Sequence, residues 1–163
     1  MLRAVLSIGS NMNDRYGLIM TAFEEFRDEL VASSRVYSTP PWGVSDQEEF
    51  LNATIIVEVD TTPMKLLRRC QELEQRAERK RTVHWGPRTL DVDIITAYED
   101  GEMLKSDHPE LILPHPWAHA RAFVLIPWLE ADPEAMLGHR QVADLIARLP
   151  REDVDGVRLA DVE

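Results

Sequence analysis

The chain has 163 residues, with 18 lysines and arginines against 29 aspartates and glutamates, so its formal net charge at pH 7 is −11. This length predicts a single domain with its own hydrophobic core, and the negative charge argues against the broad basic surface that DNA or RNA binding needs. No apolar run approaches the roughly 20 residues of a membrane span, and the N-terminus becomes polar too soon for a signal peptide, so a soluble cytoplasmic protein is expected.

The first part of the chain carries alternating strand and helix patterns. Strands are indicated by apolar, β-prone runs, and helices by apolar residues three and four apart. In chain order, these patterns predict a strand at 3–8, a helix at 14–31 with Asn13 or Asp14 as N-cap, a strand at 33–38, a strand at 50–59, a helix at 62–77 and a strand at 90–95. The one cysteine, Cys70, falls on the apolar face of the second helix, so we expect a buried, inert thiol.

This β-α-β-β-α-β order is typical of the α+β ferredoxin-like plait, an antiparallel sheet with two helices on one face. Beyond it, residues 100–116 are irregular, and apolar segments predict helices at 123–129 and 142–149. We therefore expect one domain over residues 1–163, in which 134–163 supply a C-terminal helix and a loose acidic tail.

Asp91 and Asp93 are the most informative pair in the sequence. They lie two apart in an apolar strand pattern, and positions i and i+2 of a strand point to the same side. Carboxylates that close repel each other unless a cation lies between them. Hard oxygen ligands suit Mg²⁺, with substrate phosphates completing the shell. On spacing alone, however, a strand with an acidic, solvated outer face is the simpler interpretation.

A dense group of cations precedes this strand, which is unusual in an acidic protein. Its members are Arg76, Arg79, Lys80, Arg81, His84 and Arg88. Like charges held together need a counter-anion or a solvated segment, and arginine can bind two phosphate oxygens at once. Beside a candidate Mg²⁺ pair, the group favours a polyphosphate site.

Several motifs occur together in an order that resembles a known family. They are Ile8-Gly9-Ser10-Asn11, Tyr37-Ser38-Thr39-Pro40-Pro41, Phe50-Leu51-Asn52-Ala53, the block from Trp85 to Asp93, Leu113-Pro114-His115-Pro116 and Arg121-Ala122-Phe123-Val124-Leu125. Over residues 2–133 the chain resembles the 6-hydroxymethyl-7,8-dihydropterin pyrophosphokinases of folate biosynthesis, which move pyrophosphate from ATP to a pterin.

The resemblance implies two Mg²⁺ ions held on ATP by Asp91 and Asp93, with Arg79 and Arg81 as catalytic groups on the triphosphate. It places the ATP-binding positions at Glu74, Arg79, Arg81, Trp85, Arg88, His115 and Arg121. It places the pterin-binding positions at Thr39, Pro40, Trp42, Phe50, Asn52, Trp85 and Phe123. A flat pterin suits two aromatic stacking faces and the paired donor and acceptor of an amide side chain.

Three positions depart from the family's pattern. Glu78 stands where glycine is usual, Phe50 where tyrosine is frequent, and Pro116 where an aromatic residue often follows the histidine. None of these changes removes an essential charge. We therefore expect an active enzyme with two small-molecule substrates, working as a monomer without nucleic acid or membrane partners.

Other interpretations remain open for individual motifs. Taken alone, Phe50 and Phe123 suit core packing, His115 suits a loop histidine bonded to backbone, and residues 9–11 suit a turn and helix entry, since they lack the lysine of a Walker A loop. For the whole chain, the alternatives are a nucleotide-sensing ferredoxin-like binding module and a nucleotidyl or γ-phosphoryl transferase.

Overall fold

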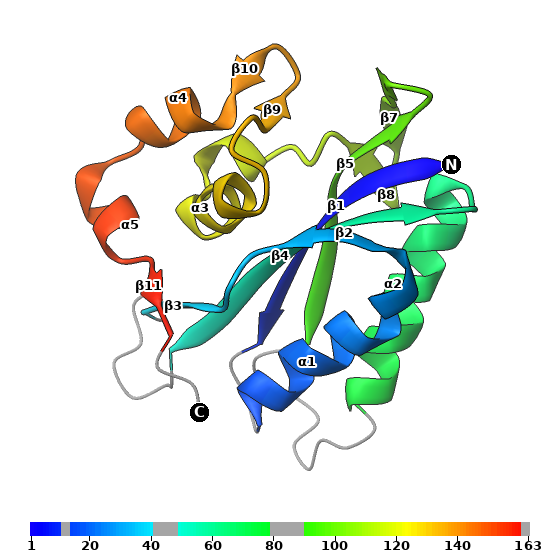
Figure 1. Ribbon diagram of the computed structural model, residues 1–163, viewed down its shortest axis with the longest axis horizontal. Helices are drawn as coiled ribbons and strands as arrows, with labels where there is room; N and C mark the ends of the chain where they lie inside the picture. Colours follow the sequence, from blue (N-terminus) through cyan, green and yellow to red (C-terminus); the bar gives the residue numbers. More distant parts are fainter. Residues whose placement is uncertain (11–13, 41–48, 79–89, 161–163) are drawn as a thin grey trace.

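The computed structural model describes residues 1–10, 14–40, 49–78 and 90–160, and the ribbon in Figure 1 gives the arrangement of their elements. The strands are β1 (Leu2–Ser10), β2 (Leu30–Ser33), β3 (Tyr37–Thr39), β4 (Phe50–Val59), β5 (Asp91–Glu99), β6 (Glu102–Met103), β7 (Ser106–His108), β8 (Leu111–Leu113), β9 (Met136–Leu137), β10 (Arg140–Gln141) and β11 (Arg158–Leu159). The α-helices are α1 (Arg15–Glu25), α2 (Pro63–Glu78), α3 (Ala122–Ala131), α4 (Val142–Ala147) and α5 (Arg151–Asp155), with short 3-10 turns at Arg27–Glu29 and Ala118–Ala120.

The main sheet has the strand order β11-β3-β4-β1-β5-β6, with β2 also paired to β4, and its pairings are antiparallel. Taking the predicted strands alone, this is the expected ferredoxin-like arrangement, in which β1 lies between β4 and β5. Residues 102–113, expected to be irregular, form short strands instead.

Side-chain alternation gives the sheet two apolar faces. One face of β1, β4 and β5 packs against α1 and α2, and its buried residues include Leu6, Ile8, Ala53, Ile55 and Ile94. The opposite face packs against α3 and α4, and the residues buried there include Val5, Ile56, Ile95, Leu125 and Trp128. Figure 1 shows the two helix layers on either side of the sheet.

The first helix is shorter than the predicted 14–31. Asp14 caps its N-terminus by accepting a hydrogen bond from the Gly17 N–H at 3.0 Å, as one of the two expected caps. The helix then ends at Glu25, and Leu30 begins β2, where it pairs with Val57 of β4. The predicted strand at 33–38 is in fact two short strands along the same edge of β4, separated by residues 34–36.

A charged cluster joins α1 to α2. The Arg69 guanidinium donates to the carboxylates of Glu25 at 2.8 Å and Glu29 at 2.7 Å, and lies 4.3 Å from the centre of the Phe26 ring. Burial on its own would raise the pKa of Glu25, but hydrogen bonds from Arg69 and Arg76 outweigh it and lower that pKa. The ion pairs of Glu25 therefore contribute stability only while Glu25 is ionised.

Cys70 is fully buried on α2, as expected, and burial raises the pKa of its thiol to about 12. The expectation of a loose tail is wrong for residues 151–160. These residues form α5 and β11, and β11 pairs with β3 at the edge of the main sheet. Within the described residues, no helix is both long and apolar enough to cross a membrane.

Candidate active site

One rung across the sheet brings together residues far apart in the sequence. Tyr37 of β3 pairs with Asn52 of β4, Asn52 with Gly9 of β1, and Gly9 with Asp91 of β5. Directly paired residues project from the same face of a sheet. Strands lie about 4.8 Å apart, so the backbones of Asn52 and Asp91 are separated by roughly 10 Å with only a glycine between them. Because glycine has no side chain, it leaves the sheet surface open between the Asn52 amide and the Asp91 carboxylate.

The next rung towards the helix layer continues this polar surface. Thr54, Ser7 and Asp93 are paired across β4, β1 and β5. One rung further, the same face carries the apolar side chains that pack under α3. The sheet face is thus apolar where α3 covers it and becomes polar towards the end of the sheet that carries Asn52 and Asp91. This change of polarity predicts a ligand site beyond the N-terminus of α3.

A cavity of about 910 Å³ opens at that place. Its lining includes eight of the positions expected from the sequence, namely Thr39, Pro40, Phe50, Asn52, Asp91, Asp93, Arg121 and Phe123. The volume falls in the upper part of the range for small-molecule sites. Residues expected to bind ATP and residues expected to bind a pterin therefore line one cavity.

The amide of Asn52 is held in place within this cavity. The Thr39 hydroxyl donates to Asn52 Oδ1 at 3.2 Å, and the Asn52 side chain is nearly buried. A Cβ built on Gly9 would lie only 2.9 Å from Asn52 Nδ2, so the amide occupies the space that glycine leaves open. Phe50 lies on β4, two residues before Asn52, and Phe123 lies on α3; both line the cavity, and Phe123 also packs against the core beneath α3.

Arg121 and His115 lie near the N-terminus of α3. Arg121 is the N-cap residue of that helix, and its guanidinium carbon is 5.7 Å from the centre of the Phe123 ring. His115 Nδ1 accepts from the Trp117 N–H at 3.2 Å, as expected for a loop histidine bonded to backbone. Burial and the positive charge of Arg121 lower the pKa of His115, while Asp91 opposes them. The imidazole is therefore held in its neutral form, with Nε2 as the donor.

Glu74 has a different position from the other expected ATP-binding residues. It lies on α2, and its carboxylate accepts from the Val92 N–H at 2.8 Å. Val92 is the residue between Asp91 and Asp93, so Glu74 fixes the backbone that carries the carboxylate pair. Glu74, like His115, is absent from the described lining of the cavity.

Asp91 and Asp93 have the chemistry of a partial magnesium site. Both are half-buried, leave the same face of β5 and line the cavity. Among the described residues there is no cluster of three or more histidine, cysteine, aspartate or glutamate side chains that could hold an ion. A pair of carboxylates fits a magnesium ion that takes its remaining ligands from water and substrate phosphates.

Part of the expected site lies outside the described residues. This applies to Trp42, Arg79, Arg81, Trp85 and Arg88. Conversely, the cavity contains residues that were not expected from the sequence. Gly9 and Ser10 line it as the end of β1 rather than forming a turn, and four further lining residues come from the C-terminal segment, namely Glu152, Asp153, Gly156 and Val157.

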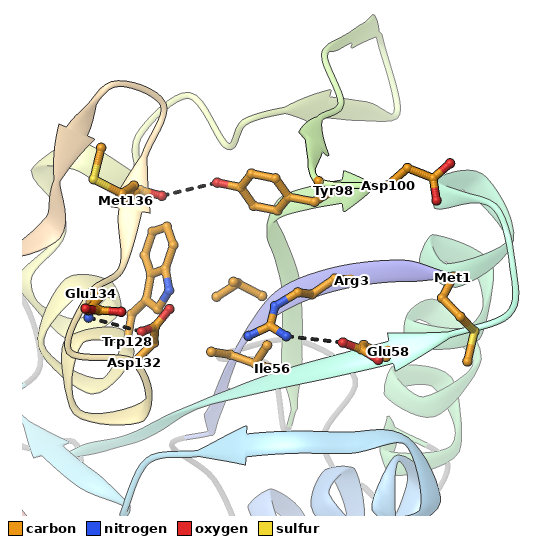
Figure 2. Close-up of a pocket in the computed structure, with 12 residues that line it drawn as sticks. Met1, Arg3, Ile56, Glu58, Tyr98, Asp100, Trp128, Asp132, Glu134 and Met136 are labelled. Carbon is orange, nitrogen blue, oxygen red and sulfur yellow. Dashed lines mark hydrogen bonds and ion pairs between the residues drawn. The ribbon is translucent and has the colours of Figure 1, made fainter.

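A second cavity, of about 490 Å³, lies at the opposite end of α3 (Figure 2). Its lining carries four carboxylates, from Glu58, Asp100, Asp132 and Glu134, and one guanidinium, from Arg3. Arg3 already donates to Glu58 at 3.2 Å. The negative end of the helix dipole also faces this side. A polyphosphate would be repelled here, which leaves the larger cavity as the candidate active site.

Comparisons with known proteins show the family of this chain. The sequence profile of the family described as 7,8-dihydro-6-hydroxymethylpterin-pyrophosphokinase matches residues 5–133. The 2-amino-4-hydroxy-6-hydroxymethyldihydropteridine pyrophosphokinase of Mycobacterium bovis is 44% identical over 98% of this chain and 90% of its own length. The protein of the same name from Methylorubrum extorquens is 38% identical, over 96% of this chain and 99% of its own length.

Among solved structures, wild-type Plasmodium falciparum HPPK-DHPS superposes with a TM-score of 0.65 at 14% identity. The match covers 88% of this chain and 40% of that protein, so the chain spans less than half its length. At this identity the likeness shows the fold alone.

Proposed function

Because this chain belongs to the 7,8-dihydro-6-hydroxymethylpterin-pyrophosphokinase family, we propose that it transfers pyrophosphate from ATP to the hydroxymethyl group of 6-hydroxymethyl-7,8-dihydropterin. The products are AMP and the pterin diphosphate, within folate biosynthesis. The observation that carries this proposal is that one cavity is lined by the Asp91 and Asp93 carboxylates, by the Asn52 amide and by two phenylalanines.

In this reaction the hydroxymethyl oxygen forms a bond to the β-phosphorus of ATP. The bond from that phosphorus to the oxygen bridging the α-phosphate breaks, AMP departs with the electron pair, and the hydroxyl proton is released. The barrier arises from negative charge that accumulates on the phosphate oxygens, so groups placed at those oxygens lower it most.

We propose that Asp91 and Asp93 bind two Mg²⁺ ions together with ATP. Their shared face on β5 and their place in the cavity support this assignment. When bound, magnesium would neutralise developing phosphate charge and align the reacting oxygens. Glu74 then acts indirectly, because its hydrogen bond to the Val92 N–H holds the strand between the two carboxylates.

The remaining assignments divide the cavity into two ends. Arg121, at the positive end of α3, and the neutral His115 would contact the nucleotide phosphates. Thr39, Pro40, Phe50, Asn52 and Phe123 would surround the pterin. Arg79, Arg81, Trp85, Arg88 and Trp42 complete the proposed contacts and are assigned by resemblance, outside the described residues.

The partners proposed for this enzyme are two small molecules, ATP and the pterin. The net charge of −11 supports the absence of nucleic acid, and the single buried thiol suits the reducing cytoplasm. We propose a monomer, and light scattering on a size-exclusion column would contradict this by giving a multiple of 18.7 kDa.

Product analysis tests the function directly. The protein is incubated with ATP, Mg²⁺ and the hydroxymethyl-dihydropterin, and nucleotides and pterins are separated by chromatography. AMP with pterin diphosphate is expected. ADP would indicate a γ-phosphoryl transferase, and no turnover would favour a nucleotide-sensing binding module.

The metal assignment has its own test. Asp93→Asn is expected to lower kcat by at least about a hundredfold, with an unchanged thermal transition, because it removes a carboxylate ligand but keeps the side chain's shape. Asp107→Asn is the control, since Asp107 lies on β7 away from the described cavity lining. A near-normal rate in the Asp93 variant, at limiting as well as saturating Mg²⁺, would remove that assignment.

A further inference from the structure

The C-terminal segment closes one side of the substrate cavity. Residues 151–160 follow α4 and return to the sheet, where Arg158 pairs with Ser38 and Leu159 with Tyr37. The Ala160 N–H also donates to the Val36 carbonyl at 2.9 Å. Figure 1 shows α5 and β11 beside β3, at the end of the sheet opposite the N-terminus. The segment is therefore part of the main sheet, next to the strand that carries Thr39.

Four residues of this segment face the cavity, namely Glu152, Asp153, Gly156 and Val157. The backbone at Gly156 comes so close to the pterin side that a Cβ there would lie 3.6 Å from Cδ of Pro40. The segment thus lies against the proposed pterin end and away from β5 at the other side of the sheet.

Few hydrogen-bond acceptors are carried by the described side chains assigned to the pterin end, namely those of Thr39, Pro40, Phe50, Asn52 and Phe123. The pyrimidine ring of a pterin presents several N–H donors, from its amino group and its ring amide. Asn52 offers one carbonyl oxygen, and that oxygen already accepts from the Thr39 hydroxyl at 3.2 Å. A buried donor left without an acceptor costs more than the hydrogen bond itself contributes. A further acceptor on this side of the cavity would therefore strengthen pterin binding.

Asp153 is well placed to be that acceptor. Its side chain is half-buried, whereas Glu152 is exposed. Among the described residues, the Asp153 carboxylate has no hydrogen-bond or ion-pair partner, in contrast to Asp155 of the same helix, which pairs with Arg151 at 3.6 Å. Its oxygens are open to a ligand in the cavity.

Resting on the proposed function, we propose that residues 151–160 form the pterin-side wall of the active site and that the Asp153 carboxylate accepts a hydrogen bond from a ring N–H of the pterin. The match to the family profile ends at residue 133, so this contact belongs to a part of the chain outside that match. The wall makes Asp153 a specificity-determining residue for the second substrate.

Steady-state kinetics on three variants test this inference. Asp153→Ala is expected to raise KM for the pterin by about tenfold or more, since a hydrogen bond to a charged group is lost, with KM for ATP unchanged. Asp153→Asn keeps one acceptor oxygen and should recover much of the loss. Asp155→Ala is the matched control on the same helix and should behave as wild type. Equal pterin KM values for the Asp153→Ala and Asp155→Ala variants would overturn the inference, as would an equal rise in KM for ATP.

Calorimetric titration with 6-hydroxymethylpterin, in the presence of a non-hydrolysable ATP analogue, separates this inference from the proposed function. If wild type binds the pterin and the Asp153→Ala variant binds it about tenfold more weakly, the inference is supported even when turnover is absent. If wild type and the Asp153→Ala variant bind the pterin with equal affinity, the inference alone is overturned. Wild type that binds no pterin overturns both.

Discussion

Gly9 offers a sharp test of how the cavity floor is built. It lies between Asn52 and Asp91 on one rung of the sheet, and a Cβ at this position would lie 2.9 Å from Asn52 Nδ2. Ordinary contacts of a Cβ begin at 3.4 Å. The Gly9→Ala substitution therefore requires the amide of Asn52 to move by about 0.5 Å or more.

That movement has a calculable cost for pterin binding. A Cβ on Gly9 of β1 pushes the amide towards β3, which carries Thr39, so a shift of this size disturbs the length and angle of the 3.2 Å hydrogen bond from Thr39 to Asn52 Oδ1. Misplacing both the donor and the acceptor of the amide should cost about 2 kcal/mol, or about thirtyfold in kcat/KM for the pterin. Fold stability should change little, because the preference for alanine over glycine within a strand offsets the disturbed hydrogen bond.

The assay is a comparison of kcat/KM for each substrate, with thermal unfolding as the check on folding. A double-mutant cycle with Asn52→Ala identifies the mechanism, because Gly9→Ala should cost little once the amide is absent. If Gly9→Ala is as harmful in the Asn52→Ala background as in wild type, displacement of the amide is refuted. An equal loss for ATP would refute it as well.

Three further predictions concern stability and ionisation. Arg69→Ala should lower the free energy of unfolding, measured by urea titration, by about 2 kcal/mol at neutral pH. The difference from wild type should shrink as pH falls below 4.5, because the pKa of Glu25 is depressed and its stabilising contribution is present above that value and lost in acid. An unchanged difference in acid would contradict this. Thr54 is fully buried, and its hydroxyl has no hydrogen-bond partner among the described residues. Thr54→Val should therefore raise stability by about 1 kcal/mol, and a lower melting temperature would count against it. Arg121→Gln removes a nearby positive charge and should raise the pKa of His115, followed by NMR titration of the ring proton, and a fall would contradict the assigned geometry.

The central strands could be predicted because their own residues carry the signal. Within Phe50 to Val59 every second residue from Leu51 onwards is apolar, and the observed strand has the same bounds. The end of α1 could not be predicted in this way. Leu30 continues the helical spacing of the preceding apolar residues, but its packing is decided by pairing with Val57, far along the chain. Where a residue satisfies two local patterns, a distant partner decides between them.

The same distinction applies to the candidate site. Asp91, Asp93 and Asn52 were predicted from motif and strand period, and the sheet register then brings them into one cavity. Asp153 and Gly156 were not predicted, because their position depends on a two-residue strand pairing with β3. A strand that short leaves no periodic signal in the sequence.

The pairing of β11 with β3 has a practical consequence for handling this protein. A fusion tag joined to Glu163 would begin a few residues beyond Ala160, whose N–H donates to the Val36 carbonyl, and Val157 of the same segment lines the cavity. Met1 is exposed at the far end of β1, on the other side of the molecule (Figure 1). Purification handles and immobilisation linkers therefore belong on Met1, and kinetic constants from C-terminally tagged material should be compared with those of cleaved protein.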